Sequence, residues 1–287
     1  MRMYDSEPTL DDNQVLEFCK NGFLMLEGVV PEEINERVRA HFGTAETIPQ
    51  SPSILSEDWF VENVVLNPHV TGAVRSLLGK NFVLPNQLAV HRNRAPFAGQ
   101  RWHRDGNAPK FNIELNYVQT MYLPQDVPLE MGPTEMLPGS HFLFSEGGQM
   151  GHYGNIKGSY KAVAPAGSVY MHEYGLWHRG SRSTGTGIRD MLKYTYWRSS
   201  PPQRDWVIDP DFDVSMADYA LGGAVPKFRA QFRDCQDSAE MFYWMMGRSD
   251  EFRVKGGHSW PIQPAQMFID RSYWAPGEKY ETEQVGG

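Results

Sequence analysis

Between Phe82 and Trp197 the sequence is a succession of short β-type runs separated by Pro, Gly and Asn. Many short strands with frequent breakers are typical of an all-β sandwich or barrel. The region therefore predicts a mainly β core, and the expected strands are Phe82–Leu84, Gln87–Asn93, Gln100–Asp105, Glu114–Leu123, Glu135–Leu137, Tyr160–Val163, Ser168–His172, Leu176–Arg179 and Asp190–Trp197.

Helical patterns flank this β region, with apolar residues at helical spacing and polar caps or glycines at the ends. On the N-terminal side we expect a helix over 9–20 capped by Thr9 or Asp11, a strand over 23–28, a helix with Pro31 as its first residue that Gly43 closes, a loop over 44–58, and a helix over 68–78. On the C-terminal side a helix over 238–247, rich in Met and aromatic residues, is predicted to be buried or to form an interface.

The remaining segments are predicted to be irregular. Residues 142–159 hold five glycines and are expected to form a mobile loop at the mouth of the barrel, and residues 278–287 a frayed end. We expect 1–287 to form a single domain. It comprises a helical support (1–80), a β core (82–198) and an aromatic-rich extension (199–287) that acts as a lid or as a homodimer surface.

Composition narrows the possible function classes. A formal net charge of −8 argues against a nucleic-acid partner, which normally requires a basic face. The sequence contains no run of about 18 apolar residues, so no membrane span is predicted. The first ten residues lack the apolar core of a signal peptide. The two cysteines, Cys19 and Cys235, lie far apart and outside any metal-type spacing. We therefore expect a cytoplasmic protein that uses neither a membrane nor a nucleic acid.

One tripeptide in the β region has the spacing of a metal site. In an extended strand, His103 and Asp105 project to the same side and can bind adjacent positions of one metal ion. With His178 as third ligand they would complete the two-histidine, one-carboxylate triad of non-haem Fe(II) oxygenases. Taken alone, the tripeptide is a weak signal that is more often a solvated turn or a surface pair, and the same ligands could hold Zn(II).

Four stretches in order resemble the phytanoyl-CoA dioxygenase family of Fe(II)/2-oxoglutarate oxygenases. They are Phe18–Glu33, Trp102–Gly106 with its His-x-Asp, Met131–His141 with its Pro-Gly-Ser-His, and Ala166–Leu192 with His178 and Arg189. Met131 departs from the family, which usually has Asn there. The resemblance covers roughly residues 9 to 197 and implies a double-stranded β-helix, a cupin-like jelly roll with helices packed outside.

The resemblance also implies a cofactor set and roles for single residues. His103, Asp105 and His178 would bind Fe(II), and 2-oxoglutarate would chelate the iron and pair its remote carboxylate with Arg189. Gln100 resembles an amide that some members use on the cosubstrate, and Thr120 is a further candidate. O2 and 2-oxoglutarate would yield succinate and CO2 while a substrate C–H bond is oxidised. Asp105 fills the position that related halogenases leave open for halide, so hydroxylation or desaturation is favoured over chlorination.

Several assignments stay open at this level. His141 is expected to make structural hydrogen bonds, and His91 is either a pocket group or a surface residue. Trp102, Met136, Tyr170 and His172 are candidates to line the barrel, depending on strand register.

The expected substrate is a small apolar, aromatic-rich natural product, because the chain holds eight Trp and fourteen Met. The alternatives are an acyl-CoA or amino-acid hydroxylase of the same family, an iron oxygenase that works without 2-oxoglutarate, and a non-catalytic jelly-roll binding protein.

Overall fold

The computed structural model describes residues 2–48, 53–105, 113–143, 149–150, 154–220 and 233–252. The predicted frayed end over 278–287 lies outside these ranges, and at Cys235 only the backbone is described. The helices are α1 (Asp12–Asn21), α2 (Glu32–Phe42), α3 (Asp58–Phe60), α4 (Pro68–Leu78) and α6 (Arg233–Met245), with a π-helical turn over Val61–Val65 and short 3-10 turns over Ile54–Ser56, Leu129–Met131, Ser140–Phe142 and Ser249–Glu251.

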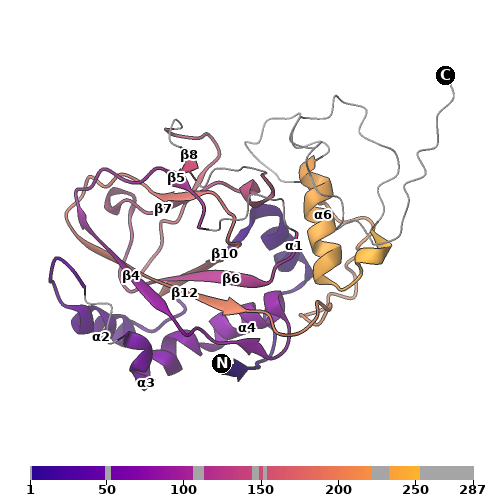
Figure 1. Ribbon diagram of the computed structural model, residues 1–287, viewed down its shortest axis with the longest axis horizontal. Helices are drawn as coiled ribbons and strands as arrows, with labels where there is room; N and C mark the ends of the chain where they lie inside the picture. The colour runs from indigo at the N-terminus through magenta and orange to yellow at the C-terminus, as the bar shows by residue number, and fades with distance from the viewer. Residues whose placement is uncertain are drawn as a thin grey trace.

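The strands form two antiparallel sheets that face each other (Figure 1). The larger sheet has the order β1-β3-β12-β6-β10-β2, with β4 also paired to β12, and the smaller has the order β8-β5-β11-β7-β9. Their bounds are β1 Met3–Tyr4, β2 Phe23–Leu26, β3 Phe82–Val83, β4 Leu88–Ala95, β5 Trp102–His103, β6 Tyr117–Leu123, β7 Thr134–Met136, β8 Gln149–Met150, β9 Tyr160–Lys161, β10 Ser168–His172, β11 His178–Gly180 and β12 Gly187–Trp197.

The larger sheet separates two apolar cores, because successive side chains of a strand point to opposite faces. On β6, Val118 and Tyr122 pack into the core shared with the helices. Met121 and Leu123 instead pack with Met136 of β7 in the core between the two sheets. Figure 1 shows α2, α3 and α4 on the far side of the larger sheet from β5 and β7. The interior between the sheets is therefore the place where a buried site can form.

The expected double-stranded β-helix with helices outside is confirmed, and most elements lie where they were predicted. Asp11 caps α1 through a capping box with Gln14, and Gly22 follows in the left-handed conformation. The third predicted helix has the bounds of α4. Caps and glycines make these boundaries readable, since they satisfy the free backbone groups at helix ends.

Several predicted segments differ from the structure. Pro31 precedes α2 as its cap instead of forming its first residue. The strand expected over 100–105 is only β5, so Asp105 lies in a bend beyond it. The loop expected over 44–58 contains the turn Ile54–Ser56, and that expected over 142–159 contains β8, although 144–148 and 151–153 lie outside the described residues. The turn Ile54–Ser56 is capped locally by the side chain of Ser53, whereas β8 depends on its pairing with β5.

Helix α6 packs beside α1 (Figure 1). Its residues Met241, Phe242 and Met245 are buried in the core shared with the helices, as the apolar pattern of 238–247 predicted. The Cys19 thiol is free and buried, and it lies 3.5 Å from the sulfur of Met245. Within the described ranges, none of the helices is long and apolar enough to cross a membrane.

Candidate metal and cosubstrate site

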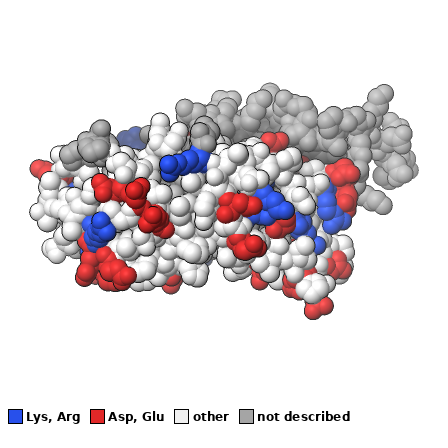
Figure 2. All heavy atoms as spheres, turned by 90° about the horizontal axis from the view of Figure 1, so that it is seen from below, with Lys and Arg blue, Asp and Glu red and all other residues white. Residues whose placement is uncertain are grey.

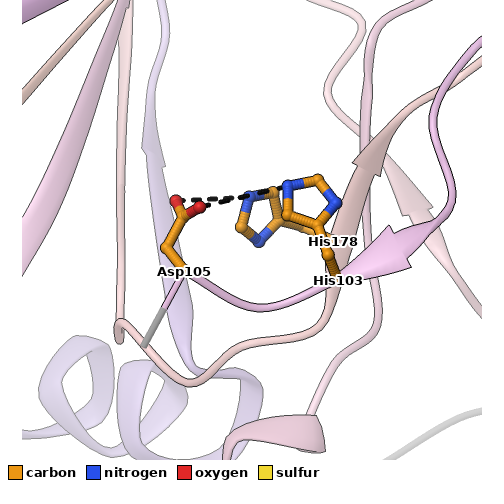
Figure 3. A group of neighbouring side chains, drawn as sticks. All are labelled: His103, Asp105 and His178. Carbon is orange, nitrogen blue, oxygen red and sulfur yellow. Dashed lines mark ion pairs between the residues drawn. The ribbon is translucent and has the colours of Figure 1, made fainter. Parts of the chain in front are cut away.

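His103, Asp105 and His178 meet between the two sheets, at the centre of the smaller one (Figure 3). His103 on β5 and His178 on β11 are direct cross-strand partners, and their ring centroids lie 4.5 Å apart. The Asp105 carboxylate comes within 4.0 Å of His103 Nε2 and 3.6 Å of His178 Nε2. One ligand atom from each of the three residues lies within 4.8 Å of the others. This spacing suits three ligands of a single metal ion.

The two imidazoles are oriented by the backbone. His103 Nδ1 donates to the carbonyl of Arg101, and His178 Nδ1 donates to that of Leu176, both at 2.9 Å. A carbonyl can only accept, so Nδ1 carries the proton and Nε2 keeps its lone pair toward the centre of the site. Burial also lowers the pKa of His178, which favours the neutral ring that a metal requires.

Asp105 is kept ionised by its neighbours. Burial alone would raise the pKa of its carboxyl, but the charge and the hydrogen bond of the Lys193 ammonium hold that pKa below the ordinary value. The ammonium of Lys193, on β12, lies 3.0 Å from Asp105 Oδ2. The donor set is thus two neutral nitrogens and one anionic oxygen, which fits Fe(II) and similar divalent ions.

Arg189 extends the site along the inner face of β12. Its side chain is 3 % exposed, Nη1 donates to the carbonyl of Gly132, and Nε is buried without a hydrogen-bond partner. Burial lowers the pKa of this guanidinium. No carboxylate of the described residues forms an ion pair with Arg189. A buried cation without an anion is unfavourable, so this group is suited to an anionic ligand.

The triad and Arg189 line one cavity of about 60 Å³. The other lining residues are His91, Asn93, Gln100, Met121, Thr134, Gly180, Met191 and Lys193. Gln100 Oε1 accepts from the backbone N–H of Gly180, which fixes the amide at this wall. A larger cavity of about 480 Å³ lies on the outer side of the smaller sheet, and the triad and Arg189 do not line it. Two of its charged residues, Glu135 and Arg179, pair with each other. The smaller cavity is therefore the one that holds the chemistry.

The structure does not bring Thr120 to this cavity. Thr120 is fully buried on the face of β6 that carries Val118 and Tyr122, whereas its neighbour Met121 lines the site. The predicted role of Thr120 on the cosubstrate has no geometric support, because the alternation of β6 turns its side chain toward the helices.

The sequence did not decide whether His91 and the four candidate barrel-lining residues face the site, and the structure shows where each of them lies. His91 lines the cavity, while Met136 and Tyr170 pack in the core between the sheets. The His172 ring lies 5.1 Å from that of His178. Trp102 faces away from the site, because it precedes His103 in the strand, and its ring lies 4.7 Å from the guanidinium of Arg179.

His141 makes a structural contact, as predicted. Its ring nitrogen Nε2 is 3.0 Å from the carbonyl of Cys19, and burial lowers the pKa of the imidazole to about 3.

Sequence reasoning missed Lys193, although a signal for it existed. Lys193 lies four residues after Arg189 in the same strand, so an even spacing places both side chains on one face. Met191 lies between them and also lines the cavity. Any inward assignment of Arg189 therefore implied an inward lysine beside the metal ligands.

A jelly roll that holds two imidazoles and one carboxylate around one point has the ligand arrangement of non-haem Fe(II) oxygenases. The chain is a member of the phytanoyl-CoA dioxygenase family, whose model matches residues 18–191, more than half of the sequence. This family consists of Fe(II)- and 2-oxoglutarate-dependent oxygenases, as the resemblance implied, and the match includes the triad and Arg189.

Solved structures of similar fold agree with this family. Ligand-free HygX from Streptomyces hygroscopicus is 17 % identical with a TM-score of 0.53, over 67 % of this chain and 88 % of that one. SnoN, an α-ketoglutarate-dependent epimerase of nogalamycin biosynthesis, is 17 % identical with a TM-score of 0.51, over 66 % and 83 %. The carbocyclase SnoK of the same biosynthesis is 18 % identical with a TM-score of 0.50, over 70 % and 91 %.

At such identities these likenesses establish the fold. HygX has also been solved with nickel and 2-oxoglutarate bound, and SnoN with Fe3+, α-ketoglutarate and nogalamycin RO. No curated protein sequence matches the chain.

Proposed function

We propose that this protein oxidises a C–H bond of a small, ring-containing natural product, using Fe(II), O2 and 2-oxoglutarate. The observation that carries the proposal is that the metal triad and a buried, unpaired guanidinium share one cavity. A metal site alone would also fit a zinc protein or an iron oxygenase without a cosubstrate. A second, cationic subsite in the same cavity favours a ligand that chelates the metal at one end and carries a carboxylate at the other.

Each residue has a defined task in this proposal. His103, Asp105 and His178 would hold Fe(II) and leave its other coordination positions to the cosubstrate and O2. Arg189 pairs with the remote carboxylate of 2-oxoglutarate, and Gln100 supports the wall between them. When bound, Fe(II) would activate O2, which is the oxidant, while 2-oxoglutarate supplies two electrons and is released as succinate and CO2. The chain itself would orient the reactants through Arg189 and the three metal ligands.

Three aromatic rings support a substrate with a planar apolar part. Tyr117 on β6 and Trp197 on β12 are cross-strand partners with ring centroids 4.8 Å apart, and Tyr174 stacks edge-on against Tyr117 at 5.1 Å. By strand alternation, Trp197 lies on the same face as Arg189 and Lys193, at the other end of β12. Trp197 is 43 % exposed and so offers ring surface to a ligand.

Because Arg189 lies at the start of this face of β12 and Trp197 at its end, we place the cosubstrate beside Arg189 and the planar part of the substrate beside the three rings. SnoN and SnoK, from nogalamycin biosynthesis, have a similar fold and make a natural-product substrate a consistent choice.

Charge at the surface is consistent with a small-molecule partner. The face seen in Figure 2 has acidic and basic side chains interspersed, and no continuous basic stretch crosses it. The proposal retains a single domain over 1–287 in the reducing cytoplasm, with the extension over 199–287 as a lid or homodimer surface. The free, buried thiol of Cys19 supports the reducing setting.

The experiment is an incubation of the protein with Fe(II), 2-oxoglutarate, O2 and a pool of aromatic and polycyclic natural products. Mass spectrometry is expected to detect succinate together with a gain of oxygen or a loss of hydrogen in one pool member. Asp105→Ala serves as the matched control. Product formation only with acyl-CoA thioesters would overturn the substrate class. Succinate no higher than in the control, with any pool, would favour the non-catalytic alternative.

A further inference from the structure

Asp105 has a single hydrogen-bond donor among the residues that the structure describes, and that donor is Lys193. The nitrogens His103 Nε2 and His178 Nε2 also face the carboxylate, at 4.0 and 3.6 Å. Both rings donate through Nδ1 to backbone carbonyls, so in the neutral state these Nε2 atoms are acceptors and cannot donate to a carboxylate.

The two partners differ in how firmly the backbone holds them. Asp105 lies in a bend beyond the end of β5, outside any strand ladder. Lys193 lies inside β12, where Met121 of β6 and Ala89 of β4 are its partners on either side. A lysine anchored in a central strand therefore contacts a metal ligand that its own backbone leaves weakly restrained.

We propose that Lys193 is a positioning residue for the iron site, which holds Asp105 Oδ2 so that the carboxylate presents Oδ1 to the metal. Hydrogen-bonded partners of this kind orient ligand carboxylates, and their removal lowers metal affinity by about 10–100-fold. The inference rests on the proposed metal site and adds a residue to it.

An opposing effect makes the inference refutable. A lysine ammonium beside a divalent cation repels it, so a lysine that only neutralised Asp105 in the metal-free protein would weaken metal binding. Under positioning, removal of Lys193 lowers metal affinity. Under simple charge neutralisation, removal raises it.

The test is an anaerobic titration of the purified full chain with Fe(II) alone, read by chelator competition without 2-oxoglutarate or turnover. Lys193→Met removes the donor and the charge, Lys193→Gln removes the charge but keeps an N–H donor, and Lys193→Arg keeps both. We expect Lys193→Met to bind Fe(II) about 10–100-fold more weakly than wild type, Lys193→Gln to lose less, and Lys193→Arg to retain most of the affinity. Lys161→Met is the control, because Lys161 is an exposed residue of β9 away from the triad.

The outcomes separate the inference from the function on which it rests. If Lys193→Met and Lys193→Gln bind Fe(II) as tightly as wild type or more tightly, positioning by Lys193 is refuted while the metal site stands. If wild type itself binds no Fe(II), the proposed metal site fails and the role of Lys193 falls with it. Thermal unfolding of each metal-free variant shows that altered binding does not come from a misfolded chain.

Discussion

Replacement of Arg189 by Met tests the cosubstrate subsite in isolation from the metal. The Arg189 side chain is 3 % exposed and has an unpaired Nε, so an anion that enters the cavity finds a desolvated cation already in place. Methionine has a similar length and leaves the cavity largely filled, but it can pair with no carboxylate. The variant therefore removes one partner of a buried ion pair and leaves the ligand carboxylate uncompensated.

The expected size of the effect follows from that burial. Removal of one partner of a buried, hydrogen-bonded ion pair costs about 3–5 kcal/mol. This loss corresponds to about a hundredfold to a few thousandfold in the dissociation constant of 2-oxoglutarate. The ligand-free protein should not lose stability to the same extent, because the variant also removes a buried charge that has no anionic partner there.

Calorimetric titration of 2-oxoglutarate into the Ni(II)-loaded protein measures this loss without turnover. Arg182→Met is the matched control, because Arg182 is exposed and lies near the outer cavity. Metal affinity should be unchanged in both variants. A loss of less than about tenfold in Arg189→Met would refute the assignment of Arg189 as the cosubstrate anchor.

Two further substitutions test the register of the sheet and a buried histidine. Thr120→Val should leave the affinity for 2-oxoglutarate unchanged and the stability equal or slightly higher. The reason is that the hydroxyl of Thr120 is buried without a hydrogen-bond partner and faces the helices. Weakened cosubstrate binding in calorimetry would contradict this placement. His141→Gln should flatten the fall of stability in acid. Burial lowers the pKa of His141 from 6.5 to about 3, so its contribution is complete above pH 6.5 and is lost as pH falls toward 3. At pH 5 the free energy of unfolding should have lost about 2 kcal/mol from this source. Urea unfolding at pH 7.5 and pH 5 measures this loss. The same pH dependence in wild type and variant would contradict the role of His141.

Much of the site was predictable from sequence because its residues belong to recognisable motifs. His103, Asp105, His178 and Arg189 come together as the order of the motifs implied, and the matched family covers all four. Local patterns also located α1 and α4, because their capping residues and closing glycines can be recognised in the sequence.

The remaining features depend on strand register. A shift of one residue moves a side chain to the other face of a sheet, and nothing in the local sequence of β6 says whether Thr120 or Met121 faces inward. Lys193 has an even spacing from Arg189, but only the register of β12 shows that the face they share is the one turned toward the metal ligands. Asp105 was assigned to a strand that ends at His103, yet the bend still turns its carboxylate to the two imidazoles.

The central claim is that the triad and Arg189 together bind Fe(II) and 2-oxoglutarate, and an anaerobic absorption spectrum tests it most directly. Wild-type protein with both ligands is predicted to give a weak visible metal-to-ligand charge-transfer band that Asp105→Ala lacks. A folded wild-type protein that shows no such band with Fe(II) and excess 2-oxoglutarate would contradict the claim.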